Sequence, residues 1–178
     1  MSATLTEAAL RTDGRESEPL RVLFVCTGNT CRSPMAAALY NDMSLRPREI
    51  CSACAEDPLR RDTVALSAGL YASEGDPITP EAAEALREAE ILPMPGNDYT
   101  AHRAQSVTEA LMESADLVVG ISGRHAMELT LRFPEYASKI TAMPMDIADP
   151  FGRGMPVYRE CLMQLRYCLE LMRAGGER

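Results

Sequence analysis

The sequence predicts an α/β protein with three layers, in which a parallel sheet carries helices on both faces. Short apolar runs alternate along the chain with helical segments, and this order is typical of successive βαβ units. The first apolar run passes through a tight turn directly into a helix start, which is typical of an anion-binding loop at the carboxyl end of a strand. The 178 residues, 46% of them hydrophobic, suit one domain with a buried core.

Four apolar runs are the predicted strands. The first consists of four apolar residues, as expected of a parallel strand that is covered on both faces. In chain order the predicted strands cover residues 22–25, 64–69, 116–121 and 140–143.

Capping residues mark the predicted helix starts. Ser33 and Thr79 are each followed by proline, a pattern typical of an N-cap and a first helical position. Ser106 and Glu109 have the spacing of a capping box, and Ser122 is the predicted cap of the next helix. The predicted helices cover residues 33–43, 80–89, 107–113, 123–132 and 156–172.

Composition and the N-terminal segment limit the class of protein. Residues 1–19 lack the apolar core of a secretory signal, so we predict a mobile tail there and a single domain over 20–174. No apolar run reaches the ~20 residues of a membrane span. The net charge of −8 and a single lysine, Lys139, argue against a nucleic-acid-binding surface. Six cysteines without a secretory signal favour free thiols in a reducing, cytoplasmic compartment.

The turn after the first strand has Cys26 at one end and Arg32 at the other, a Cys-x5-Arg spacing. Gly28 and Asn29 tolerate positive φ, which lets several backbone N–H groups face one small bowl. A helix N-terminus and a nearby arginine stabilise a nucleophilic thiolate, and the arginine fork can hold two phosphoryl oxygens. The loop therefore predicts phosphoryl transfer. For the bare spacing, the alternative is a buried cysteine beside a solvated arginine.

The segment Cys26-Thr-Gly-Asn-Thr-Cys-Arg-Ser-Pro34 resembles the active-site loop of the low-molecular-weight protein tyrosine phosphatase family. The resemblance recurs at residues 67–69, 102–104, 115–119 and 146–152. It implies a four-stranded sheet, a phosphocysteine intermediate and a phosphorylated protein as substrate, and we expect no cofactor. The residues expected to bind the phosphate, besides Arg32, are Thr27, Gly28, Asn29, Thr30, Cys31 and Ser33.

By the same resemblance, Ser33 donates a hydrogen bond to the thiolate and helps it leave, although helix capping is its other possible role. Asn29 is expected to hold the loop in shape, or to serve as a simple turn residue. Asp149, which precedes Pro150, resembles the general acid of the family. An Asp-Pro turn is the alternative for this pair, and Asp146 is the nearest rival for the acid.

Among the other cysteines, Cys31 is a candidate for redox chemistry, and the rest do not form a predicted metal site. Cys31 lies five residues after Cys26, near enough for a reversible disulfide, unless it is only a small loop residue. A structural zinc site starting at Cys51-x2-Cys54 needs four ligands. The remaining candidates, Cys161 and Cys168, belong to the apolar stripe of the last helix, and neither His102 nor His125 has ligand spacing. We expect no metal.

Thr30 is the residue that bears on the substrate. Phosphotyrosine-specific members of the family usually carry an aliphatic residue there, whereas phosphoarginine-specific members carry threonine. A hydroxyl suits a polar phosphoguanidine better than an aryl ring, and Asp149 would both pair with the guanidinium and protonate its nitrogen. The sequence therefore favours a protein arginine phosphatase. A tyrosine phosphatase in which Thr30 only packs is the alternative.

Three further functions fit less well. A thioredoxin-coupled arsenate reductase needs extra cysteines after the third strand, and residues 120–134 contain none. A phosphate-binding module without turnover would not need both Cys26 and Asp149. A nucleotide-binding loop would end in Gly-Lys-Ser or Gly-Lys-Thr, which this loop lacks.

Overall fold

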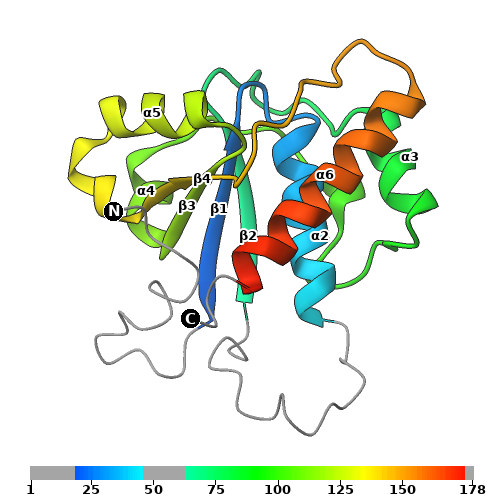
Figure 1. Cartoon of the computed structure of the whole chain (residues 1–178), viewed down its shortest axis with the longest axis horizontal. Coiled ribbons are helices and arrows are strands. Elements are labelled where there is room, and N and C mark those ends of the chain that lie inside the picture. The colour runs from blue at the N-terminus through cyan, green and yellow to red at the C-terminus, as the bar shows by residue number, and fades with distance from the viewer. Residues whose placement is uncertain (1–18, 46–62, 175–178) are drawn as a thin grey trace, which may run out of the picture.

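The computed structural model describes residues 19–45 and 63–174. Four parallel strands form one sheet in the order β2-β1-β3-β4, which confirms the predicted fold class (Figure 1). The strands are β1 (Leu20–Cys26), β2 (Thr63–Gly69), β3 (Leu117–Gly120) and β4 (Ile140–Ala142). Because β1 pairs on both sides, the loop that follows it lies at the middle of the carboxyl edge of the sheet.

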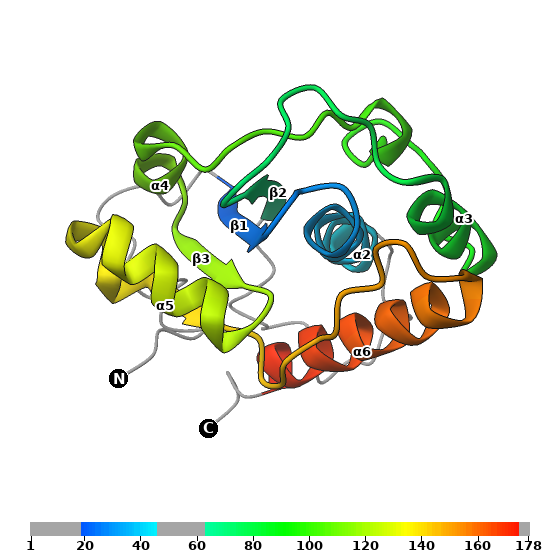
Figure 2. The ribbon, with the colours of Figure 1, turned by 90° about the horizontal axis from the view of Figure 1, so that it is seen from above.

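Helices cover both faces of this sheet. On one face lie α2 and α6, with α3 packed beside them, and on the other lie α4 and α5 (Figures 1 and 2). The helices are α2 (Arg32–Leu45), α3 (Pro80–Glu88), α4 (Glu109–Ser114), α5 (Gly123–Arg132) and α6 (Met155–Ala174). Two short 3₁₀ segments, η2 (Tyr99–Ala101) and η3 (Pro134–Lys139), complete the described elements.

The apolar run of β1 feeds two separate cores. Val22 and Phe24 join the core under α2, α3 and α6, whereas Leu23 and Val25 join the core under α4 and α5. All four side chains are fully buried, and each contributes about 1.5–3 kcal/mol by leaving water. The strand that carries the loop is therefore held firmly from both faces.

Two predicted caps are confirmed. Thr79 accepts a hydrogen bond from the N–H of Ala82 at the start of α3, with Pro80 in the first turn. Ser122 accepts one from the N–H of His125 at the start of α5. Both helices therefore begin at the residues that their N-cap side chains predict.

Two other predicted caps are wrong. The helix α2 already begins at Arg32, so Ser33 lies inside its first turn and its hydroxyl faces the loop. Ser106 is also no cap, because it pairs with Gly69 as an extension of the sheet. Thr108 caps α4 instead, accepting from the N–H of Leu111. In both cases tertiary partners override the local pattern.

Some predictions fall outside the described residues, namely those for most of the N-terminal tail and for Cys51 and Cys54. Over residues 19–45 and 63–174, no helix is both long and apolar enough to span a bilayer. Within those ranges no three His, Cys, Asp or Glu side chains are grouped so that they could hold a metal ion.

Candidate active site

The loop between β1 and α2 is shaped around the side chain of Asn29. This residue has φ of +58° and is fully buried. Its amide Nδ2 donates to Ser33 Oγ and to Ser67 Oγ, each at 2.9 Å, and its Oδ1 accepts from the N–H of Gln105 at 2.9 Å. Its carbonyl lies 2.7 Å from His102 Nε2, which must donate because a carbonyl only accepts. These contacts hold a left-handed backbone that asparagine tolerates better than most residues.

The sulfur of Cys26 lies at the bottom of this loop, and Cys26 is 2% exposed. Its Sγ is 3.0 Å from Ser33 Oγ and 3.4 Å from the N–H of Asn29. Each of these groups can donate a hydrogen bond to the sulfur when it acts as a nucleophile or a leaving group.

The proton of Ser33 has two possible acceptors. Its Oγ accepts from Asn29 Nδ2, so its own O–H is free to donate to Cys26 Sγ or to the Ala68 carbonyl, which lies at 3.2 Å. A thiolate attracts this proton more strongly than a neutral carbonyl does. The Ser33 O–H can therefore donate to the Cys26 sulfur when the sulfur is a thiolate and to the Ala68 carbonyl when it is not.

Arg32 and Asp149 meet across the rim of the loop. Arg32 is buried, and its Nη2 lies 2.6 Å from Asp149 Oδ2, while its Nη1 donates to the Ile147 carbonyl at 3.3 Å. The N–H of Phe151 donates to the other Asp149 oxygen at 3.2 Å. Asp149 keeps half of its side chain exposed, so it is held at the loop yet remains open to the pocket. The structure thus brings three of the predicted residues, Cys26, Arg32 and Asp149, to one cavity.

Asp146, the rival acid, is engaged elsewhere. Its Oδ1 accepts a hydrogen bond of 2.8 Å from the N–H of Gly123 at the start of α5. Among the residues that line the pocket, Asp149 is present and Asp146 is not. The geometry therefore favours Asp149 over Asp146 as the carboxylate that faces a substrate.

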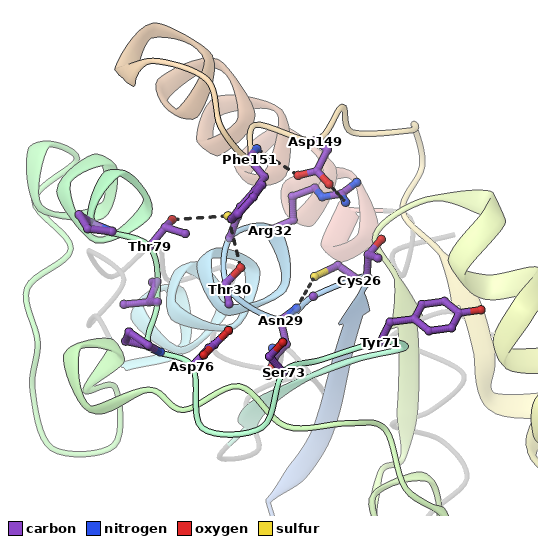
Figure 3. Close-up of a pocket in the computed structure, with 16 residues that line it drawn as sticks. Cys26, Asn29, Thr30, Arg32, Tyr71, Ser73, Asp76, Thr79, Asp149 and Phe151 are labelled. Carbon is purple, nitrogen blue, oxygen red and sulfur yellow. Dashed lines mark hydrogen bonds and ion pairs between the residues drawn. The ribbon is translucent and has the colours of Figure 1, made fainter.

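A cavity of about 390 Å³ opens above the loop (Figure 3). Its floor is formed by residues 26–32, and Thr30 contributes a half-exposed hydroxyl-bearing side chain. The aromatic rings of Tyr71 and Phe151 stand at its rim, 63% and 66% exposed. This volume fits one phosphorylated side chain.

Cys31 is one of the residues that line the pocket, and its Sγ lies 3.7 Å from Thr30 Oγ1. Its Sγ lies 3.4 Å from Thr79 Oγ1 and 3.4 Å from the Tyr158 hydroxyl, and Cys31 is buried. Burial, together with the hydrogen bond to Cys31, raises the pKa of Tyr158, so the phenol remains protonated. Cys26 and Cys31 are both free thiols with different partners, and a disulfide between them remains a prediction.

Sequence reasoning missed both histidines of this site. His125 Nε2 lies 3.1 Å from Thr27 Oγ1, and its Nδ1 lies 2.8 Å from Ser122 Oγ. Burial lowers the pKa of His125, with nearby Arg32 adding to the effect, and burial also lowers the pKa of His102. Neither contact is local, although His102 lies in one of the segments that carry the family resemblance.

Sequence comparison places this chain among known protein phosphatases. A family model for low molecular weight phosphotyrosine protein phosphatases matches residues 21–174. A protein-arginine-phosphatase of Bacillus subtilis is 36% identical over 155 residues, covering 83% of this chain and 91% of the relative. The tyrosine phosphatase PtpB of Staphylococcus haemolyticus is 31% identical over 166 residues, covering 88% of this chain and all of the relative.

Solved structures of phosphatases share the fold of this chain. The YwlE arginine phosphatase of Geobacillus stearothermophilus superposes with a TM-score of 0.71 at 32% identity, covering 88% of this chain and 92% of the other. A low molecular weight protein tyrosine phosphatase of T. tengcongensis superposes with a TM-score of 0.72 at 36% identity, covering 89% and 99%. The chain therefore belongs to the low-molecular-weight phosphotyrosine protein phosphatase family of cysteine-based protein phosphatases.

Proposed function

We propose that this protein hydrolyses phosphoarginine on proteins through a phosphocysteine intermediate. The observation that carries the proposal is the Thr30 side chain, which offers a hydroxyl in the pocket floor within the loop that begins at Cys26; its Oγ1 lies 3.7 Å from Cys31 Sγ. The relatives named protein-arginine-phosphatase, at 36% and 33% identity, support it.

In the first step, the Cys26 thiolate attacks phosphorus, so that an S–P bond forms as the P–N bond breaks. Asp149 gives its proton to the departing nitrogen, so that the free arginine side chain leaves as a guanidinium and Asp149 becomes a carboxylate. Arg32 and the N–H groups of the loop hold the three remaining phosphoryl oxygens while their charge shifts.

In the second step, water replaces the cysteine. The Asp149 carboxylate takes a proton from water, whose oxygen attacks phosphorus, and the S–P bond breaks to release phosphate and the thiolate. Ser33 and the Asn29 N–H, at 3.0 and 3.4 Å from the sulfur, stabilise that leaving thiolate. The proton that Asp149 gave to the arginine nitrogen in the first step is thereby restored.

The ion pair between Arg32 and Asp149 couples binding of the phosphoryl group to the position of the general acid. Phosphoryl oxygens bind the same guanidinium donors that hold Asp149 at 2.6 Å. A bound phosphoryl group therefore competes for Arg32 and releases Asp149 to face the leaving nitrogen. The N–H of Phe151 keeps the carboxyl at the rim during this exchange.

A second candidate is hydrolysis of phosphotyrosine. The exposed ring of Phe151 at the rim would flank an aryl group, and several relatives are named tyrosine phosphatases. The two candidates share the loop chemistry and differ only in the group that the upper pocket accepts.

The test compares kcat/KM on two peptides that differ only in phosphoarginine or phosphotyrosine, with Cys26→Ser as the control for turnover. Thr30→Ile is expected to lower the ratio of arginine to tyrosine activity by about tenfold to a hundredfold, because the guanidine N–H groups lose an acceptor. Thr30→Val keeps the shape of threonine and isolates the hydroxyl. A wild type that prefers phosphotyrosine, or a Thr30→Ile variant that changes both activities together, would contradict the arginine assignment.

A further inference from the structure

Asp76 is a carboxylate in the pocket wall for which the proposed mechanism has no use. It follows β2 in the segment that leads to α3, and it lines the same cavity as Cys26 and Asp149. Its side chain is exposed, and it makes no hydrogen bond or ion pair with any residue of 19–45 or 63–174. Figure 3 shows Asp76 and Asp149 on opposite sides of the pocket, with Thr30 between them in this view.

The backbone at Asp76 is fixed although its side chain is exposed. The carbonyl of Asp76 accepts from the N–H of Ala104 at 2.7 Å, and the N–H of Gly75 donates to the Ala104 carbonyl at 2.9 Å. The N–H of Asp76 also donates to the Ser73 carbonyl at 3.2 Å. Gly75 has φ of +87°, a left-handed turn that suits glycine.

The wall that carries Asp76 is tied at both ends to the catalytic loop. The N–H of Tyr71 donates to the Thr27 carbonyl, and the N–H of Thr79 donates to the Thr30 carbonyl, each at 2.9 Å. The backbone of Asp76 is therefore held at a set position relative to the phosphate site. A short side chain on a fixed backbone can discriminate between ligands, because little conformational freedom is lost when it binds.

The charges around the cavity suggest what this carboxylate binds. Arg32 is the one basic residue among those that line it, and Asp76 and Asp149 are the two acidic ones. A carboxylate repels a phosphoryl dianion, so Asp76 does not assist a phosphate-binding site as such. It suits a ligand that carries a positive charge beyond its phosphoryl group.

We propose that Asp76 binds the guanidinium group of the phosphoarginine side chain and is a specificity-determining residue. This inference rests on the proposed function. A phosphorylated guanidinium keeps a positive charge and N–H groups that point away from phosphorus, and a tyrosyl ring has neither. Asp149 faces the phosphorylated nitrogen, and Asp76 accepts from the N–H groups on the opposite side.

The test substitutes Asp76→Asn, which keeps the size of the side chain and removes its charge. For the phosphoarginine peptide we expect KM to rise about three- to tenfold, as for one partly exposed charge pair, with little change in kcat. For a phosphotyrosine peptide with the same flanking residues, KM is expected to stay level or fall. The inhibition constant of inorganic phosphate is also expected to stay level or fall, which would show that the loop is intact.

Two further variants sharpen the result. Glu135→Gln removes the same charge from η3, outside the pocket lining, and is expected to change no parameter. Asp76→Lys reverses the charge and is expected to raise KM for phosphoarginine further while phosphate inhibits more strongly.

The outcomes separate the two proposals. If wild type prefers phosphoarginine but Asp76→Asn and Asp76→Lys leave its KM unchanged, or weaken both peptides equally, the role of Asp76 is refuted and the proposed function stands. If wild type prefers phosphotyrosine, the proposed function fails and this inference fails with it.

Discussion

Ser33→Ala removes the shorter of the two hydrogen bonds that reach the Cys26 sulfur. The hydroxyl lies 3.0 Å from Sγ, whereas the Asn29 N–H lies 3.4 Å away. Position 33 is fully buried inside the first turn of α2, so water does not readily replace the missing hydroxyl. Alanine also suits a helix, which limits the effect on α2 itself.

The magnitude follows from the charge on the sulfur. A hydrogen bond to a charged group contributes about 1.5–3 kcal/mol, and each 1.4 kcal/mol changes a rate about tenfold. The thiolate is the leaving group when the proposed phosphocysteine breaks down. We therefore expect Ser33→Ala to lower kcat by about ten- to a hundredfold through that second step.

The assay follows pre-steady-state release of an aryl alcohol from an activated aryl phosphate. Slow breakdown of phosphocysteine predicts a burst followed by a slow steady state.

Ser67→Ala is the matched control for this prediction. It removes the other Asn29 Nδ2 acceptor, also at 2.9 Å, without touching the sulfur. We expect a stability loss of about 1 kcal/mol with kcat nearly unchanged. If Ser67→Ala lowers kcat as much as Ser33→Ala does, Ser33 acts through the shape of the loop and the reasoning above is refuted.

Three more predictions concern the acid, the thiols and pH. Asp149→Ala is expected to lower kcat/KM more for a phosphoarginine peptide than for an activated aryl phosphate, which needs less proton transfer, and equal losses would indicate a structural role. Peroxide is expected to inactivate the enzyme reversibly through a Cys26–Cys31 disulfide, and mass spectrometry that finds sulfonic acid at Cys26 without this link would contradict it. Burial lowers the pKa of His102 and of His125, so as pH falls these side chains are protonated in the unfolded chain before they are protonated in the folded protein. The unfolding free energy from urea titrations is therefore expected to fall as pH drops below about 6.5. A flat profile from about pH 7.5 to 5.5 would be evidence against this.

The parts of the fold that could be predicted depend on local information. The apolar run of β1, the Thr79 and Ser122 caps and the Cys-x5-Arg spacing are each contained in a few consecutive residues. Such patterns determine where an element begins and ends without knowledge of its neighbours. The carboxyl edge of the sheet then follows from the parallel order, which places the loop at a binding edge.

The errors arose where a distant partner determines the role of a side chain. Ser33 has a good capping pattern, yet its hydroxyl faces the Cys26 sulfur and the Ala68 carbonyl, because the loop brings both within reach. The two histidines illustrate the same limit. His125 meets Thr27 across 98 positions of sequence, and His102 meets Asn29 across 73, so neither contact leaves a local pattern.

Different residues of the loop hold its shape and face the substrate pocket. Asn29 and Cys31 are 0% and 4% exposed, and their side chains contact Ser67 and Tyr158, respectively. Thr30 lies between them with its side chain half exposed in the pocket, and its backbone carbonyl is held by the N–H of Thr79. A substitution at Thr30 therefore changes the surface that the substrate meets while its two neighbours keep the backbone in place. We therefore expect substitutions at Thr30 to change the preferred substrate and to leave the chemistry of the loop intact.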